Sequence, residues 1–145
     1  MFPKNQLPPI GMDITYKDHK KFNRAELEEL FLSVNWSSGH YPDLLVEALR
    51  NYGSVFSAWD GDKLVGLAAS MDDKTMTAYI HYMLVHSSYQ NRGIGQKLLE
   101  MAKDHYKDYL RVVLITYTPG KTFYERNGFV PDEGLYAMNL TTLYD

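Results

Sequence analysis

The chain of 145 residues contains no cysteine. It therefore cannot form a disulfide framework, bind a metal ion through thiolates or use a cysteine nucleophile. Long hydrophobic runs are also missing: the first residues lack the apolar stretch of a signal peptide, and no later segment has the length of a membrane span. From these absences we expect a cytoplasmic protein that works without a metal ion and without a membrane.

An excess of basic residues is missing as well. Fifteen Lys and Arg residues against eighteen Asp and Glu residues give a formal net charge of −3. Proteins that bind nucleic acid by neutralising its phosphates normally carry a basic surface, so we expect no nucleic-acid partner. This charge does not exclude a local pocket for an anion. Aromatic residues are abundant at 14%, twelve of them tyrosines, which suits either a partly polar cleft or a tyrosine-rich core.

One domain is expected from the length, because most domains contain roughly 100–200 residues. Residues 1–10 hold three prolines and little periodicity, which indicates an extended N-terminal arm, and residues 11–145 are expected to form the single domain. Hydrophobic patterns predict elements in the order β-α-α-β-β-β-α-β-α-β-β. The expected strands lie at residues 11–17, 54–59, 63–71, 77–86, 111–117, 129–130 and 135–140. The expected helices lie near residues 24–34, 42–52, 93–107 and 121–127.

This order of elements favours the α/β (α+β) class, with a mixed sheet and helices on both of its faces. The strand, helix and strand between Thr77 and Tyr117 are expected to form a right-handed crossover that joins parallel strands. The continuous apolar run at residues 111–117 is typical of a strand that is buried on both faces.

A glycine-rich turn joins the strand at residues 77–86 to the helix that follows. Gly93 and Gly95 lie where the chain is tightest and the helix begins. The first amides of a helix have no partner inside it, and the helix dipole adds positive charge there, so this turn is expected to bind a phosphate or diphosphate. The side chain of Arg92 is expected to add a charge at the rim. Close packing of a helix on a strand would explain the two glycines equally well.

Two motifs together point to a family. The segment QNRGIG (residues 90–95) resembles the acetyl-CoA signature of the GNAT superfamily of N-acetyltransferases. The segment FYERNGF (residues 123–129) is similar to the Phe-Tyr-x-x-x-Gly-Phe segment near the end of those domains. The spacing of the motifs and the expected element order also agree, so the resemblance covers about residues 11–140. It implies a GNAT-like, mostly antiparallel sheet and the transfer of an acetyl group to an amine.

Carried over to the matching positions, the resemblance implies a site for acetyl-CoA as co-substrate. The end of the strand at residues 77–86 would bind the pantetheine arm through its backbone, as an added strand does, and an N–H near Leu84 would polarise the thioester carbonyl. Tyr124 matches the tyrosine that protonates the departing thiolate in many relatives. The residues expected to contact the cofactor are Met83, Leu84, Val85, Gln90, Arg92, Gly93, Ile94, Gly95, Gln96, Tyr124 and Arg126.

The reaction calls for a base, because an amine with a pKa near 10.4 is neutral in only about one molecule in 2,500 at pH 7. His81 is our candidate, since relatives commonly carry a glutamate or histidine on this strand and arylalkylamine acetyltransferases are similar in having a histidine at this place. Strand alternation predicts that His81 shares a face with Tyr79, Met83 and Val85. The alternative is a histidine that is merely hydrogen-bonded beneath the cleft.

The acceptor site is expected to involve the polar and aromatic segment at residues 35–41. Trp36, His40 and Tyr41 of this segment, together with Tyr79, are candidates to hold an ammonium group by cation–π contact. The same loop aromatics would also serve simply to cover the core.

The leading hypothesis is direct transfer of acetyl from acetyl-CoA to the primary amine of a small molecule, in a ternary complex. A second hypothesis is an enzyme that acetylates a protein or peptide, which requires an open cleft. A third is a non-catalytic acyl-CoA-binding regulatory module. Similar proteins commonly dimerise through their last strands, so a homodimer is a further expectation of the resemblance.

Overall fold

The computed structural model describes residues 13–143, so the predicted N-terminal arm lies outside the described residues. Within these residues, one sheet runs through the centre of the molecule in the order β1-β2-β3-β4-β5. Neighbouring strands are antiparallel, except that β4 and β5 are parallel. The strands are β1 (Ile14–Lys17), β2 (Ser54–Asp60), β3 (Lys63–Asp72), β4 (Thr77–Val85) and β5 (Arg111–Leu114).

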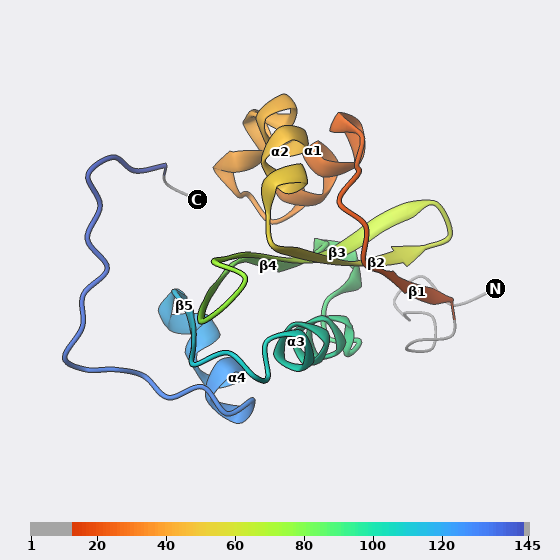
Figure 1. Ribbon diagram of the computed structural model, residues 1–145. Coiled ribbons are helices and arrows are strands. Elements are labelled where there is room, and N and C mark those ends of the chain that lie inside the picture. Colours follow the sequence, from red (N-terminus) through yellow and green to blue (C-terminus); the bar gives the residue numbers. More distant parts are fainter. Residues whose placement is uncertain (1–12, 144–145) are drawn as a thin grey trace.

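Helices cover both faces of this sheet (Figure 1). They are α1 (Arg24–Ser33) and α2 (Pro42–Asn51) on one face, and α3 (Ile94–His105) and α4 (Lys121–Arg126) on the other. Leu27 and Phe31 of α1 are buried in the core on the first face, and Ile94 and Leu98 of α3 in the core on the second. The predicted fold class is therefore confirmed. None of the described helices is long and apolar enough to cross a membrane.

Local sequence signals set the helix ends. The Asn23 side chain accepts a hydrogen bond from the amide of Glu26, and the Glu26 carboxylate accepts one from the amide of Asn23, which is the reciprocal capping box that begins α1. Pro42 starts α2 at a position where its missing N–H is not needed. Gly93 precedes α3 with a φ of 83°, in the left-handed region that favours glycine.

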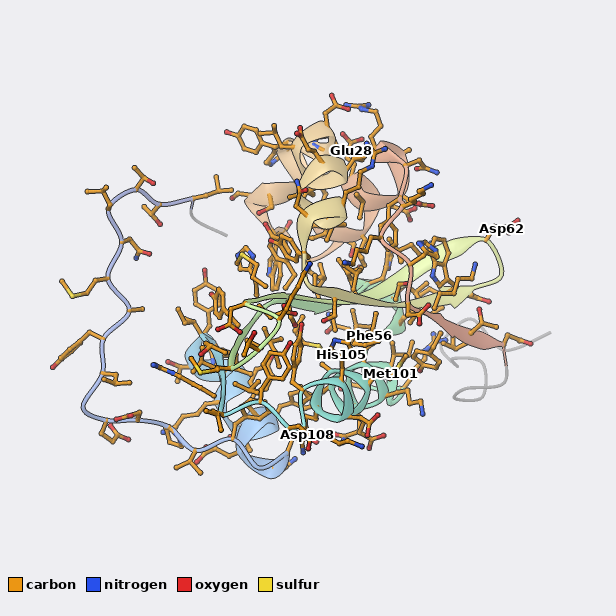
Figure 2. The ribbon with its side chains drawn as sticks, viewed as in Figure 1. Glu28, Phe56, Asp62, Met101, His105 and Asp108 are labelled. Atoms are coloured by element: carbon orange, nitrogen blue, oxygen red, sulfur yellow. The ribbon has the colours of Figure 1, made fainter. Side chains whose placement is uncertain are left out.

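A glycine of β3 lets α3 approach the sheet closely. A Cβ atom on Gly66 would lie 2.9 Å from Cδ1 of Leu98 and 3.1 Å from Cγ2 of Ile94. At the other end of the helix, His105 meets Phe56 of β2, with ring centroids 5.7 Å apart (Figure 2). The first turn of α3 is thus held at a fixed height over β3.

The two last predicted strands are wrong. Among the described residues, neither 129–130 nor 135–140 forms a strand, and residues 130–143, which we call the C-terminal tail, are all exposed. The prediction that residues 111–117 are buried on both faces is also wrong, because β5 is only half-buried or exposed. Both differences have one cause: a strand needs a hydrogen-bonding neighbour, and no described strand lies on the far side of β5.

The parallel strands β4 and β5 diverge towards their carboxyl ends. Their pairing stops at Ile80 and Leu114, while β4 continues to Val85. One edge of β4 is therefore open over its last residues, beside the first turn of α3.

Replacing Gly66 by valine tests the docking of α3. Overpacking a filled core typically reduces the free energy of unfolding by about 1–3 kcal/mol, and we expect a loss of this size for Gly66→Val in urea unfolding followed by circular dichroism. Gly134→Val is the matched control, because a Cβ on Gly134 would meet only the Asp132 side chain, at 3.6 Å. Equal stability of Gly66→Val and the wild type would contradict this packing.

Candidate active site

A cavity of about 1210 Å³ lies between the diverging ends of β4 and β5. Its walls come from β4, the first turn of α3, the segment that follows β5, α4 and the C-terminal tail. This volume exceeds the roughly 300–1,000 Å³ of typical ligand sites. Among the described residues that line the cavity there is no Asp, Glu, Lys or Arg, so its walls carry no formal charge from these residue types.

The first turn of α3 opens into this cavity. Gly93, Ile94, Gly95 and Gln96 line its wall, and no side chain of the described residues caps the helix. The left-handed residues Asn91, with a φ of 62°, and Gly93 turn the chain into the helix. Amides of the first helical turn have no acceptor inside the helix, so they remain available to a ligand at the cavity wall.

Gly95 decides between the two interpretations of the glycine turn. A Cβ atom there would lie 3.6 Å from Cγ2 of Val85, 3.7 Å from Cε of Met83 and 3.9 Å from Cζ of Phe123. These are ordinary van der Waals distances, so packing of α3 on the strands does not require a glycine at this position, whereas it does at Gly66. A side chain at residue 95 would take up space beside the uncapped amides. The residues present therefore fit a diphosphate held by backbone N–H groups.

The sequence predicted the charge of Arg92 at the rim of the phosphate site, and this prediction is wrong. The side chain is buried, with Cζ 4.8 Å from the ring centroid of Tyr89, and Nη2 donates to the carbonyl of Ser88. A buried charge needs partners. The Tyr89 ring and the Ser88 carbonyl supply them for part of the guanidinium, whereas Nε of Arg92 is buried without a hydrogen-bond partner among the described residues. Gln90, which lines the cavity, donates from Nε2 to the Val85 carbonyl at 3.1 Å. Both side chains thus fix the turn that presents the amides.

Asn127 connects the two sequence motifs. Its Oδ1 accepts a hydrogen bond from Nε2 of Gln96 at 2.6 Å, and its Nδ2 donates to the carbonyl of Phe123 at 2.8 Å. Its own carbonyl accepts from Nζ of Lys103 at 2.6 Å. These bonds hold α4 against α3. Asn127 was not among the predicted site residues, although it lies inside the second motif.

β4 carries a bulge at His81. In the ladder with β3, successive pairs pass from Tyr82 to Ile80, so His81 has no residue directly opposite. An extra residue shifts the alternation of side chains by one position. The prediction that His81 shares a face with Met83 and Val85 is therefore wrong: those two side chains pack against the core beneath α3.

The bulge places His81 among aromatic side chains on the face covered by α1 and α2. Its ring stacks on Tyr82, with centroids 4.1 Å apart, and on Tyr79, with centroids 5.4 Å apart. Its Nδ1 lies 2.6 Å from the hydroxyl oxygen of Tyr52. His81, Tyr79 and Tyr82 also line the cavity, so the predicted base is at the cavity wall and is oriented by a tyrosine.

Tyr52 is the site residue that sequence reasoning missed. Burial raises the pKa of its phenol, and Tyr82 and Tyr79 raise it further, so the hydroxyl stays protonated. In the tautomer of His81 that carries its proton on Nδ1, Nδ1–H donates to the Tyr52 oxygen. The hydroxyl of Tyr82 extends the network to Oγ of Ser38, 3.0 Å away. The sequence signal for Tyr52 was its position at the end of the apolar face of α2, because a phenol that is buried there needs a hydrogen-bond partner.

Tyr124 lies on the α4 side of the cavity. Its ring packs beside Phe123 and Phe129, with centroids 5.1 and 5.8 Å away. Burial raises the pKa of the phenol to about 12. The residue also lines the cavity. Its ring is therefore part of the core while the residue contributes to the cavity wall.

The predicted acceptor residues separate in the structure. Trp36 lines the large cavity, and Tyr41 lines a smaller pocket of about 260 Å³ that shares Tyr82 with it. His40 ends a short 3-10 helix (Ser37–His40) with its side chain exposed, and it lines neither space. The same holds for the predicted cofactor contact Arg126, which is exposed at the end of α4.

Comparison with known proteins identifies the family. The family model described as "Acetyltransferase (GNAT) domain" matches residues 51–131, more than half of the chain. The chain belongs to the GNAT superfamily. The matched part of this GNAT protein runs from the end of α2 to just beyond α4, so it includes the glycine turn, His81 and Tyr124.

Relatives of this GNAT protein occur among curated sequences. An uncharacterized N-acetyltransferase of Pyropia yezoensis is 26% identical over 133 residues, which are 87% of this chain and 76% of the relative. An uncharacterized N-acetyltransferase of Prochlorococcus marinus is 32% identical over 111 residues, which are 72% of this chain and 61% of the relative. The names of both relatives give the reaction class and no acceptor.

Solved structures show the same fold. A GNAT family acetyltransferase from Streptococcus pneumoniae matches with a TM-score of 0.74 and 27% identity, over 88% of this chain and 99% of the other. A probable acetyltransferase from meticillin-resistant Staphylococcus aureus matches with a TM-score of 0.77 and 20% identity, over 89% and 99% of the two chains.

The raised pKa of Tyr124 has a measurable consequence in alkali. In the unfolded chain a tyrosine ionises near pH 10, but in the folded protein Tyr124 stays neutral up to about pH 12. Its contribution to stability is complete below pH 10 and is lost as the pH rises towards 12. Between pH 9 and 11 the wild type should lose about 1 kcal/mol more unfolding free energy than Tyr124→Phe. Parallel curves for the two proteins in urea unfolding would contradict the shift.

Proposed function

We propose that this GNAT protein transfers the acetyl group of acetyl-CoA to the primary amine of a small molecule, directly, while both substrates are bound. The observation that carries the proposal is that the uncapped start of α3, His81 and Tyr124 line one cavity. An anion site, a candidate base and a candidate acid thus meet around a space large enough for two substrates. The absence of cysteine is consistent with transfer that needs no covalent intermediate on the enzyme.

The donor half of the site rests on backbone groups and one phenol. Acetyl-CoA supplies the acyl group as an activated thioester. The amides of the first turn of α3 hold its diphosphate, and the open edge of β4 near Leu84 offers backbone groups to an extended arm. Tyr124 carries the proton for the departing thiolate at its hydroxyl, because a pKa of about 12 keeps the phenol protonated at neutral pH.

The acceptor half of the site removes a proton from the amine. Nε2 of His81 accepts this proton while Nδ1–H donates to the Tyr52 oxygen, 2.6 Å away. A neutral oxygen at that place stabilises the imidazolium that forms and fixes the ring in the productive tautomer. Tyr52 acts through His81, so it is a positioning residue.

Uncharged aromatic walls favour a small amine with an apolar body. Trp36, Tyr79 and Tyr82 line the large cavity and present rings to which an ammonium group binds by cation–π contact. The adjoining pocket of about 260 Å³ is bounded mostly by apolar groups, including those of Leu44, Leu45, Ala48 and Leu143. Because no carboxylate of the described residues lines either space, a polyamine with several positive charges has no counter-charge there.

The alternatives are less well supported. A protein acceptor requires a groove that recognises a peptide, whereas no Asp, Glu, Lys or Arg of the described residues lines this cavity to select a charged segment. A non-catalytic acyl-CoA-binding module would not need Tyr124 at the cavity wall, or a histidine oriented by Tyr52.

Ligand-dependent melting and a thiol-release assay test the proposal together. Ligand at one hundred times its Kd stabilises a folded protein by about 2.7 kcal/mol, so acetyl-CoA and CoA should raise the Tm clearly, and ATP much less. Free thiol should then appear with small apolar amines, and not with lysine-containing peptides. Gly95→Val should weaken CoA binding by about tenfold or more, or about 1.4 kcal/mol, with Gly134→Val as the control.

Two outcomes would overturn the proposal. The absence of a Tm shift with either CoA species would remove the donor site. Stabilisation by CoA without thiol release on any amine would leave the regulatory module as the function.

A tyrosine-to-phenylalanine exchange tests the role of Tyr52. Loss of the oxygen that accepts from Nδ1–H favours the neutral imidazole, so in Tyr52→Phe the acidic limb of the kcat/KM profile should move to lower pH, and kcat should fall about tenfold. His81→Gln should abolish that limb. Tyr109→Phe, in the turn beyond the end of α3, should change neither the limb nor kcat. An acidic limb that stays in place in Tyr52→Phe would show that the tyrosine does not act through His81.

A further inference from the structure

His86 is a buried histidine that the proposed reaction does not use. It directly follows β4 and is 6% exposed. Its amide donates to the carbonyl of Val65 at 2.8 Å, so the pairing of this strand with β3 continues for one more residue. A buried imidazole needs hydrogen-bond partners, and each of its two ring nitrogens has one.

The partners of the ring fix its protonation. Nδ1 of His86 lies 3.1 Å from the amide nitrogen of Ser88, and because a backbone N–H only donates, Nδ1 is the acceptor and carries no proton. Nε2 therefore carries the proton of the neutral ring and donates to Oε1 of Glu29 on α1, 3.2 Å away. Nζ of Lys63 donates to the same oxygen at 3.1 Å, and this hydrogen bond lowers the pKa of the Glu29 carboxyl. Helix α1 thus holds the imidazole in one tautomer.

The backbone of Ser88 links this histidine to the start of α3. Its N–H is held by Nδ1 of His86, and its carbonyl accepts from Nη2 of Arg92 at 3.0 Å. Arg92 directly precedes Gly93, the left-handed residue before the helix. The ring of Tyr89 lies between the two side chains, edge-on to His86 at 5.9 Å and 4.8 Å from Cζ of Arg92. The conformation of the glycine turn therefore depends on two hydrogen bonds to one residue.

We propose that His86 is a positioning residue of the donor site. Its neutral imidazole, oriented by Glu29, holds the N–H of Ser88 and so keeps the glycine turn in the conformation that binds the diphosphate of CoA. This inference rests on the proposed function, which assigns the diphosphate to that turn. The side chain of His86 is not among the groups that line the cavity, so its effect on the donor runs through Ser88 and Arg92.

The interaction that matters is the acceptor at the δ1 position of the side chain. Without it the turn samples other conformations, and the affinity for CoA falls by the fraction of molecules that hold the binding conformation. Leucine at residue 86 would fill a similar volume and offer no acceptor. Asparagine would keep one, because its Oδ1 accepts from the amide two residues further on in an Asx turn.

Calorimetric titration of the full chain with CoA tests this role. His86→Leu should raise the Kd for CoA about tenfold, the upper range for loss of one hydrogen bond, and His86→Asn should recover most of the affinity. His19→Leu is the matched control. Nδ1 of His19 also accepts from the amide two residues further on, that of Lys21, at 3.3 Å, but His19 lies between β1 and α1 and lines neither cavity. Its Kd should equal that of the wild type.

Steady-state kinetics distinguish positioning of the donor from a general loss of structure. With an amine that supports turnover, His86→Leu should raise the KM for acetyl-CoA about tenfold and leave kcat and the KM for the amine close to the wild-type values, because the histidine contacts no reacting atom. A fall in kcat with an unchanged KM for acetyl-CoA would contradict the proposal.

Long-range ¹H–¹⁵N NMR of the wild-type histidine rings gives an answer even if His86→Leu does not fold. The ring of His86 should be neutral with its proton on Nε2, and a proton on Nδ1 would overturn the proposal. So would a folded His86→Leu that binds CoA as tightly as the wild type, or a His86→Asn that binds no better than His86→Leu. A wild type that binds no CoA would remove the proposed function as well, whereas equal Kd values for the wild type and His86→Leu would remove this inference alone.

Discussion

The arrangement of the whole site depends on the uncapped amino terminus of α3. A helix must leave its first amides without internal partners, and in this protein no described side chain satisfies them. Gly93 adopts the left-handed conformation of the turn, and the side chains of Arg92 and Gln90 hold the turn by hydrogen bonds to backbone carbonyls. Gly66 sets the distance between α3 and β3. Gly95 leaves free the space beside the amides. The first-turn amides are therefore backbone donors at the cavity wall. They suit the diphosphate of the proposed donor, although no Asp, Glu, Lys or Arg of the described residues lines the cavity.

The candidate base and the first turn of α3 lie on opposite faces of the sheet. The bulge at His81 sends the histidine to the face of α1 and α2, where Tyr52 orients it, while Met83 and Val85 stay with α3. Divergence of β4 from β5 then opens the sheet between the two faces, so that groups from both meet in one cavity. In the proposed reaction the anion is bound from one face and the amine is deprotonated from the other.

The sequence was informative wherever structure is set by local interactions. The position of α1, the glycine turn before α3 and the order of elements as far as α4 were predicted, because each follows from neighbouring residues. The bulge was not predictable, because it depends on how β3 pairs with β4, and it moved Met83 and Val85 away from His81. The role of Tyr52 was not predicted, because its partner His81 is distant in sequence. The apolar patterns at 111–117 and 135–140 predicted two strands, but of these residues only 111–114 form one, as β5 beside β4. A strand also needs a hydrogen-bonding neighbour, which a local pattern does not reveal.

Backbone amide NMR of the uniformly ¹⁵N-labelled protein during titration with CoA tests the central claim most directly. Hydrogen bonds from the first turn of α3 to a diphosphate should produce the largest downfield shifts at the amides of residues 93–96, and desulfo-CoA, which lacks the thiol but keeps the diphosphate, should reproduce them. If CoA binds while these amides keep their free-state shifts, the diphosphate is held elsewhere and the account of this site is wrong.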